Sequence, residues 1–201
     1  MRNGKKYMKL TAVGAAVLAL TLAGCGSNGT TTTAAAPASG TAKQTQTVAA
    51  KPPVVHLYMD IMTGKMINKK GWPMISPADF KVPAGATIDL TIRNFDDGTA
   101  ALPQDAAKYA KVAGTNNNNE KVNGKEITSL NPKDVSHTIT FTQLGINIPI
   151  PVTSTTEVTF KAPDKPGTYA WQCLAPCGTG KTGMQGPMVT NGYMVGNMTV
   201  Q

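Results

Sequence analysis

Alternation of apolar and polar residues over short segments is the feature that most limits the folds open to this chain. Six segments share this alternation and are rich in β-branched residues: 54–61, 86–93, 138–141, 155–160, 167–173 and 193–200. A period of two places the apolar side chains on one face of a strand, and Gly, Pro, Asn and Asp separate the segments. The sequence therefore predicts an all-β fold, a β-sandwich with one short helix over 103–113.

A polar stretch from about residue 94 to residue 132 interrupts this pattern. It contains the run Asn116-Asn-Asn-Asn119 and the pair Asn123-Gly124. A polar run of this length is typical of a solvated loop. We expect one domain over 54–201 that carries this insertion at about 94–132.

The first residues have the parts of a lipoprotein signal peptide over 1–24. A basic start is followed by the apolar run 10–20 and then by Leu22-Ala-Gly-Cys25. That ending resembles the bacterial lipobox, whose cysteine is lipidated and becomes the first residue of the mature chain. Acyl chains hold a protein stably on a bilayer when two or more are present. We therefore expect a lipid-anchored protein on the outer face of the bacterial cytoplasmic membrane.

The segment 25–53 begins with this cysteine and is predicted to continue as a flexible tether. It is composed mainly of Thr, Ala, Ser, Gly and Gln, and such a composition cannot bury enough apolar surface to fold. A chain of this length reaches roughly 25 to 30 Å end to end. The domain is thus expected to stand off the membrane.

The charge of the mature chain argues against a nucleic-acid partner. The whole sequence has 19 Lys+Arg and 11 Asp+Glu, a net charge of +8. Four of the basic residues lie within 1–24, so the mature chain keeps 15 against 11, or +4. This modest excess does not indicate a nucleic-acid-binding surface.

The loop after the segment 167–173 carries the soft-ligand chemistry of the chain. Cys173 and Cys177 are separated by Leu-Ala-Pro, and Met184 follows. Soft sulfur ligands favour copper over hard cations. Two alternatives stay open, because a disulfide between the two cysteines persists outside the cytoplasm and thiolates also bind other metals.

This loop resembles the CuA loop of cytochrome c oxidase subunit II, which is also found in nitrous oxide reductase. The family pattern is Cys-x3-Cys-x3-His-x2-Met, and Lys181 stands at its histidine position. The resemblance extends to Asp134-Val-Ser-His137, Lys81-Val-Pro-Ala-Gly85 and the run 162–169, and it covers 54–201. It implies a cupredoxin-like Greek-key β-sandwich.

The resemblance also implies a set of metal ligands. In the family, two thiolates bridge two copper ions, each ion has one histidine, and a methionine and a backbone carbonyl complete the set. Carried over to this chain, these ligands are His137, Cys173, Cys177, Met184 and the carbonyl oxygen of Ala175.

Lys181 changes what this ligand set can hold. A lysine ammonium is strongly hydrated and must lose a proton before it can bind a metal, so the second copper lacks its imidazole. The remaining set is close to that of a mononuclear electron-transfer site. We therefore favour one copper ion, with two as the alternative.

The resulting hypothesis is a membrane-anchored cupredoxin that transfers electrons outside the cytoplasm. Its partner would be a cytochrome or a terminal oxidase, with the protein serving as an electron-entry component rather than as an enzyme by itself. The alternatives are a copper-delivery lipoprotein and a metal-free scaffold. For delivery, the early residues His56, Met59, Met62 and Met66 are a candidate exposed Cu(I) site, although Met59 is expected in the core and His56 in solvent.

Overall fold

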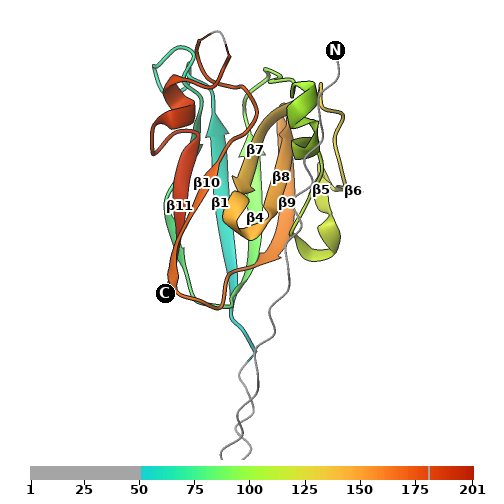
Figure 1. The fold of residues 1–201 in the computed structure, drawn as a ribbon, viewed down its shortest axis with the longest axis vertical. Helices are drawn as coiled ribbons and strands as arrows, with labels where there is room; N and C mark the ends of the chain where they lie inside the picture. The colour runs from blue at the N-terminus through green and yellow to red at the C-terminus, as the bar shows by residue number, and fades with distance from the viewer. Residues whose placement is uncertain (1–50, 181) are drawn as a thin grey trace, which may run out of the picture. The chain divides into compact units, whose positions relative to one another are not determined.

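The computed structural model describes residues 51–180 and 182–201, which form two β-sheets packed face to face (Figure 1). Both Cys25 and Lys181 lie outside the described residues, as do the predicted signal peptide and most of the tether. Within the described part of the chain, no helix is long and apolar enough to cross a membrane. The predicted all-β fold, a sandwich of two β-sheets, is confirmed.

The first sheet has six strands and the second has five. In spatial order, the first consists of β2 (Met74–Ser76), β1 (Val54–Met62), β4 (Thr87–Asn94), β9 (Ser154–Lys161), β5 (Glu120–Val122) and β6 (Lys125–Ile127). The second consists of β3 (Phe80–Val82), β11 (Val195–Val200), β10 (Gly167–Gln172), β7 (Val135–Phe141) and β8 (Ile146–Pro151). Short 3₁₀ helices connect them: η1 (Gln104–Ala110), η2 (Asn116–Asn118), η3 (Thr142–Leu144) and η4 (Gly186–Val189).

The chain passes repeatedly between the two sheets, so each contains strands that are distant in sequence. Parallel pairing joins β1 to β4 in the first sheet and β3 to β11 in the second, whereas most other pairs are antiparallel. Alternate residues of β4 and β9 point inward and are buried, as their period of two predicts. The core between the sheets includes Ile88, Leu90, Ile139 and Trp171, each at most 1% exposed.

The polar insertion is more ordered than a solvated loop. The strand β5 pairs with β9, so the hairpin of β5 and β6 extends the first sheet. Asn123 and Gly124 form its two-residue turn with φ of 49° and 81°. Positive φ at both positions is the geometry of a type I′ turn, which an Asn-Gly pair adopts readily. The insertion also contains η1, which replaces the helix predicted over 103–113.

The cysteine loop lies at the end of the sandwich where β10 ends. Figure 1 shows the segment after β10, η4 and the loop after β1 together at this end. A Cβ built on Gly71 would lie 2.5 Å from the Thr179 side chain, and one built on Gly186 would lie 3.1 Å from the Trp72 ring. The loop after β1 therefore packs directly against the cysteine loop.

Candidate metal centre

The two cysteines of the loop are free thiols whose sulfur atoms are in contact. Cys173 follows the last residue of β10, is fully buried, and donates its N–H to the Met194 carbonyl oxygen at 2.8 Å. Cys177 is half-buried, and its Sγ lies 3.2 Å from that of Cys173. One sulfur is thus enclosed by the sandwich, while the other lies near the surface.

His137 joins these sulfurs from the neighbouring strand. It lies on β7, next to an irregularity in the pairing of β7 with β8, and is 1% exposed. Its ring nitrogen and the sulfurs of Cys173 and Cys177 all lie within 4.8 Å of one another. Residues 137, 173 and 177, which the sequence placed in one site, are therefore brought together, in a group that could hold a metal ion.

Asp96 fixes the orientation of the imidazole. Its Oδ2 is 3.2 Å from His137 Nε2. Asp96 itself is held in place, because its N–H donates to Asn94 Oδ1 and its Oδ1 accepts the N–H of Gly98, both at 2.9 Å. Metal-binding histidines commonly use their second nitrogen in this way. Asp96 belongs to the polar insertion, so the insertion contributes to the site.

The other nitrogen of His137 is left without a partner. Nδ1 is buried and has no hydrogen-bond partner among the described residues. An unsatisfied buried polar atom costs about 1–3 kcal/mol. Because Nε2 already contacts Asp96, Nδ1 is the nitrogen that remains free to bind a metal, and the cluster fits such an ion.

The charges of the cluster depend on one another. Burial disfavours the imidazolium form of His137, but its contacts with Asp96 and Cys173 raise its pKa to about 9. Burial likewise opposes ionisation of Cys173, yet contacts with Cys177 and His137 hold its pKa well below the usual value. Hydrogen bonding to Cys173, together with burial, raises the pKa of Cys177 well above its usual value. The pKa of each of these three groups is therefore set by its neighbours in the cluster as well as by burial.

Thr138 connects the cysteine loop to β7. Its N–H donates to Cys173 Sγ at 3.3 Å, and its Oγ1 accepts the N–H of Leu174 at 2.8 Å. The buried Thr138 hydroxyl is also hydrogen-bonded to Thr140 Oγ1 at 3.0 Å. The Thr140 hydroxyl in turn donates to Asn147 Oδ1 at 2.7 Å. Asn147 Nδ2 donates to the carbonyl oxygens of Tyr109 and Lys111 in the insertion. A continuous chain of hydrogen bonds thus links the cysteine loop to the insertion.

The Ala175 carbonyl lies inside the loop. Ala175 is fully buried, and its oxygen accepts the N–H of Cys177 at 2.8 Å. The same oxygen is 3.7 Å from Cys173 Sγ. The carbonyl oxygen is therefore close to the two cysteine sulfurs. The Ala175 side chain plays no part in this placement.

Two methionines of the last loop have different positions. Met184, predicted as a ligand, is half-buried and packs against the edge of the core. Met188 is fully buried, and its Sδ lies 3.2 Å from Cys177 Sγ. Sequence reasoning missed Met188 because it lies four residues beyond the family position, and it missed Asp96 because nothing local connects it with His137.

The early methionine and histidine residues do not form the exposed site considered as an alternative. His56 is exposed on β1, whereas Met59 is 1% exposed and faces the core. These two residues lie on opposite faces of the strand, because side chains alternate. Met66 is 51% exposed in the loop after β1. The expected positions of His56 and Met59 are confirmed, and their shared site is wrong.

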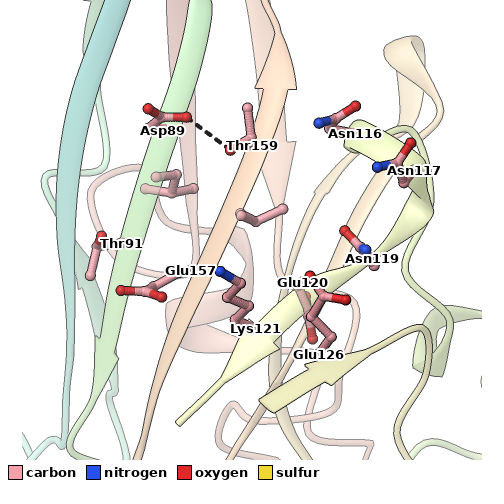
Figure 2. Close-up of a pocket in the computed structure, with 12 residues that line it drawn as sticks. Asp89, Thr91, Asn116, Asn117, Asn119, Glu120, Lys121, Glu126, Glu157 and Thr159 are labelled. Carbon is pink, nitrogen blue, oxygen red and sulfur yellow. Dashed lines mark hydrogen bonds between the residues drawn. The ribbon is translucent and has the colours of Figure 1, made fainter. Parts of the chain in front are cut away.

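A separate pocket of about 380 Å³ lies on the first sheet, with none of the cluster residues in its lining. Its lining comes from β4, β9, β5, β6 and the asparagine run. Figure 2 shows its polar side chains, among them Asp89, which accepts a hydrogen bond from Thr159 at 2.8 Å. Glu120, which also lines it, is 2% exposed, and burial raises its pKa to about 8.

No known family model matches the sequence, and no curated protein matches it. Among solved structures, a heme-copper terminal oxidase dimer is 13% identical with a TM-score of 0.38, covering 77% of this chain and 68% of that one. Auracyanin B is 18% identical with a TM-score of 0.36, covering 77% and 93%. Auracyanin A, a "blue" copper protein from Chloroflexus aurantiacus, is 14% identical with a TM-score of 0.34, covering 74% and 99%. At such low similarity, any functional assignment depends on the site itself.

Proposed function

We propose that this protein binds copper through His137, Cys173 and Cys177 and transfers single electrons. The observation that carries the proposal is the cluster of one imidazole and two thiols, with His137 and Cys173 buried, Cys177 half-buried and Nδ1 of His137 without another partner among the described residues. Soft sulfur with imidazole is the donor set of copper electron-transfer sites. Bound copper would supply the Cu(I)/Cu(II) couple.

The protein's own contribution is to hold these donors still. His137 is oriented by Asp96, and the cysteine loop is hydrogen-bonded to β7 through Thr138. Burial of Cys173 and His137 keeps water from the inner side of the site. A rigid, dry ligand set changes little between two oxidation states, which favours electron transfer over chemical turnover. The protein is then a carrier and not an enzyme by itself.

One copper ion is the proposed stoichiometry. It follows from the lysine at position 181, since an ammonium cannot replace the imidazole of a second ion without losing its proton. Lys181→His should allow uptake of a second copper, with an electron shared by both ions. Copper analysis and EPR of the two proteins test this, and a wild type that already holds two coupled ions would contradict it.

The proposed location is the outer face of the cytoplasmic membrane, with Cys25 lipidated and a cytochrome or a terminal oxidase as the partner. Two exposed apolar side chains support a partner surface: Val189, which is 70% exposed on η4 beside the site, and Met66 in the loop packed against it.

Two cysteine variants of the full chain test function and anchoring separately. Cys177→Ser should remain in the membrane fraction and lose copper, whereas Cys25→Ser should become soluble and keep copper. The measurements are fractionation, copper content, the visible and EPR spectra, and a redox titration. Reversible redox with strong visible absorption is the expected result.

Other outcomes identify the alternatives. Colourless Cu(I) binding without reversible oxidation would overturn electron transfer in favour of copper delivery. If the wild type takes up no copper, the remaining alternative is a metal-free scaffold for protein contacts. If the Cys25→Ser variant stays in the membrane fraction, the proposed lipid anchor at Cys25 is contradicted.

A further inference from the structure

The two methionines after the cysteines differ in their access to the sulfur cluster. Within residues 51–180 and 182–201, the thioether in contact with a cysteine sulfur is that of Met188, with Sδ 3.2 Å from Cys177 Sγ. Met188 is fully buried, and Met184 is half-buried at the edge of the core. Chain position alone would favour Met184, and the folded arrangement favours Met188.

The path of the loop explains this difference. Thr179 and Gln185 form a bridge, and the Gly178 N–H donates to the Gly183 carbonyl oxygen at 2.6 Å. These contacts pair the two sides of a small hairpin, and Met184 lies on its second side. Met188 comes after the hairpin, where the chain returns to the core in η4.

Both backbone polar groups of Met188 are hydrogen-bonded. Its N–H donates to the Gln185 carbonyl oxygen at 3.3 Å, and its own carbonyl oxygen accepts Gln172 Nε2 at 3.0 Å. The neighbouring Pro187 carbonyl oxygen accepts the N–H of Met194 at 3.1 Å. Gln172 is the last residue of β10, so η4 is attached to the strand that leads into Cys173.

Gly178 brings the cysteine loop and Met188 close together. A Cβ built on Gly178 would lie 2.7 Å from Met188 Cγ and 2.3 Å from the Gln185 carbonyl oxygen. Both distances are too short for any side chain, so only glycine permits this approach. The contact between Cys177 and Met188 is therefore part of a tightly packed arrangement.

We propose that the thioether of Met188, and not that of Met184, is the weak sulfur ligand that completes the copper site of His137, Cys173 and Cys177. This inference rests on the proposed function. It assigns the fourth donor to η4, where Met188 is buried in the core, and not to the small hairpin that contains Met184. Thioether sulfur is a suitable weak ligand for copper, and its identity tunes the reduction potential.

Matched variants Met188→Leu and Met184→Leu in the full chain test this assignment. A change of Met to Leu nearly conserves side-chain volume and is well tolerated in protein cores, so both variants should fold. Met188→Leu should change the visible and EPR spectra and shift the reduction potential, while Met184→Leu should leave all three as in the wild type. Circular dichroism of the metal-free proteins serves as the folding control.

A second measurement keeps the test decisive if Met188→Leu fails to fold. Selenomethionine-labelled Met184→Leu, loaded with copper, should show a selenium neighbour of copper in X-ray absorption. Absence of that neighbour, or spectra that respond to Met184→Leu equally or alone, would overturn the assignment while copper binding stands. A wild type that binds no copper would overturn the proposed function and this inference together.

Discussion

The chain contains two histidine–aspartate pairs that differ in their surroundings. His56 Nδ1 lies 3.6 Å from Asp89 Oδ2 on the outer face of the first sheet, and the side chain of His56 is 68% exposed. His137 Nε2 lies 3.2 Å from Asp96 Oδ2, and the side chain of His137 is 1% exposed. Water screens the first pair, so its energy is small. In the second, the imidazole has lost its hydration and depends on Asp96, whose side chain is still 21% exposed.

Glu120 shows what burial does without a partner. Both of its carboxylate oxygens are buried and have no hydrogen-bond partner in the described part of the chain, and burial raises its pKa to about 8. Asp96 has the opposite shift, because the hydrogen bond from His137 lowers its pKa. Burial alone thus favours the neutral acid, whereas burial beside a suitable partner preserves charge.

The largest effect is expected from His137→Ala, with His56→Ala as the matched control. Loss of a direct ligand should weaken copper binding by more than the roughly 10- to 100-fold that loss of an outer partner costs. The exposed His56 should not matter. Competition with a chromophoric Cu(I) chelator measures both affinities. Equal affinities for the two variants would show that the buried pair has no role in binding.

A smaller effect is expected from Asp96→Asn. The amide cannot support the ring orientation as the carboxylate does, so copper affinity should fall roughly 10- to 100-fold. Asp89→Asn removes the corresponding carboxylate of the exposed pair and should leave affinity unchanged. The same competition assay applies to both, and the EPR spectrum of Asp96→Asn should also change. A normal spectrum and affinity would make Asp96 dispensable.

The third prediction concerns stability and Glu120→Gln. The pKa of Glu120 is about 8 in the folded protein against an ordinary value of 4.5, so between these pH values the folded protein keeps a proton that the unfolded chain releases. Stability from this group therefore falls as pH rises between these values, by at most about 1.4 kcal/mol per pH unit. Glu120→Gln should reduce this slope in urea unfolding of the metal-free protein.

The exposed Glu126 on β6 provides the control for that experiment. Glu126→Gln makes the same chemical change at an exposed position of the same hairpin. The comparison between the two variants cancels the titration of all other groups. Identical slopes for Glu120→Gln and the wild type would mean that Glu120 finds a partner when it ionises.

Much of the fold could be predicted because most strands have one face in the core. The alternating segments 86–93 and 155–160 correspond closely to β4 and β9. The strand β8 was not predicted, because Pro149 and Pro151 interrupt the strand pattern in its sequence. Proline is tolerated there because β8 is the last strand of its sheet, and an edge strand has backbone groups that need no partner. Edge position is a property of the folded sheet and is not visible in the sequence.

The candidate site was predictable where its residues are local and not where they are brought together by folding. Cys173 and Cys177 share one short loop, and a motif identified His137. Asp96 reaches His137 across 41 residues through a turn of the insertion. Met188 enters the cluster because a small hairpin takes up the residues before it. No fixed spacing in the sequence connects Asp96 or Met188 with the cysteines or with His137, so neither residue could be assigned to the site from the sequence.

The hydrogen-bond chain from the cysteine loop to the insertion has a consequence for exchange with solvent. The Leu174 N–H is bonded to the buried Thr138 hydroxyl, which is connected through Thr140 to Asn147. To expose this amide to water, the loop must separate from β7. Its deuterium exchange should therefore be as slow as that of strand amides, although it lies outside any strand. The Met184 amide, bonded at 3.4 Å to the exposed Thr182 hydroxyl, should exchange within the fast phase.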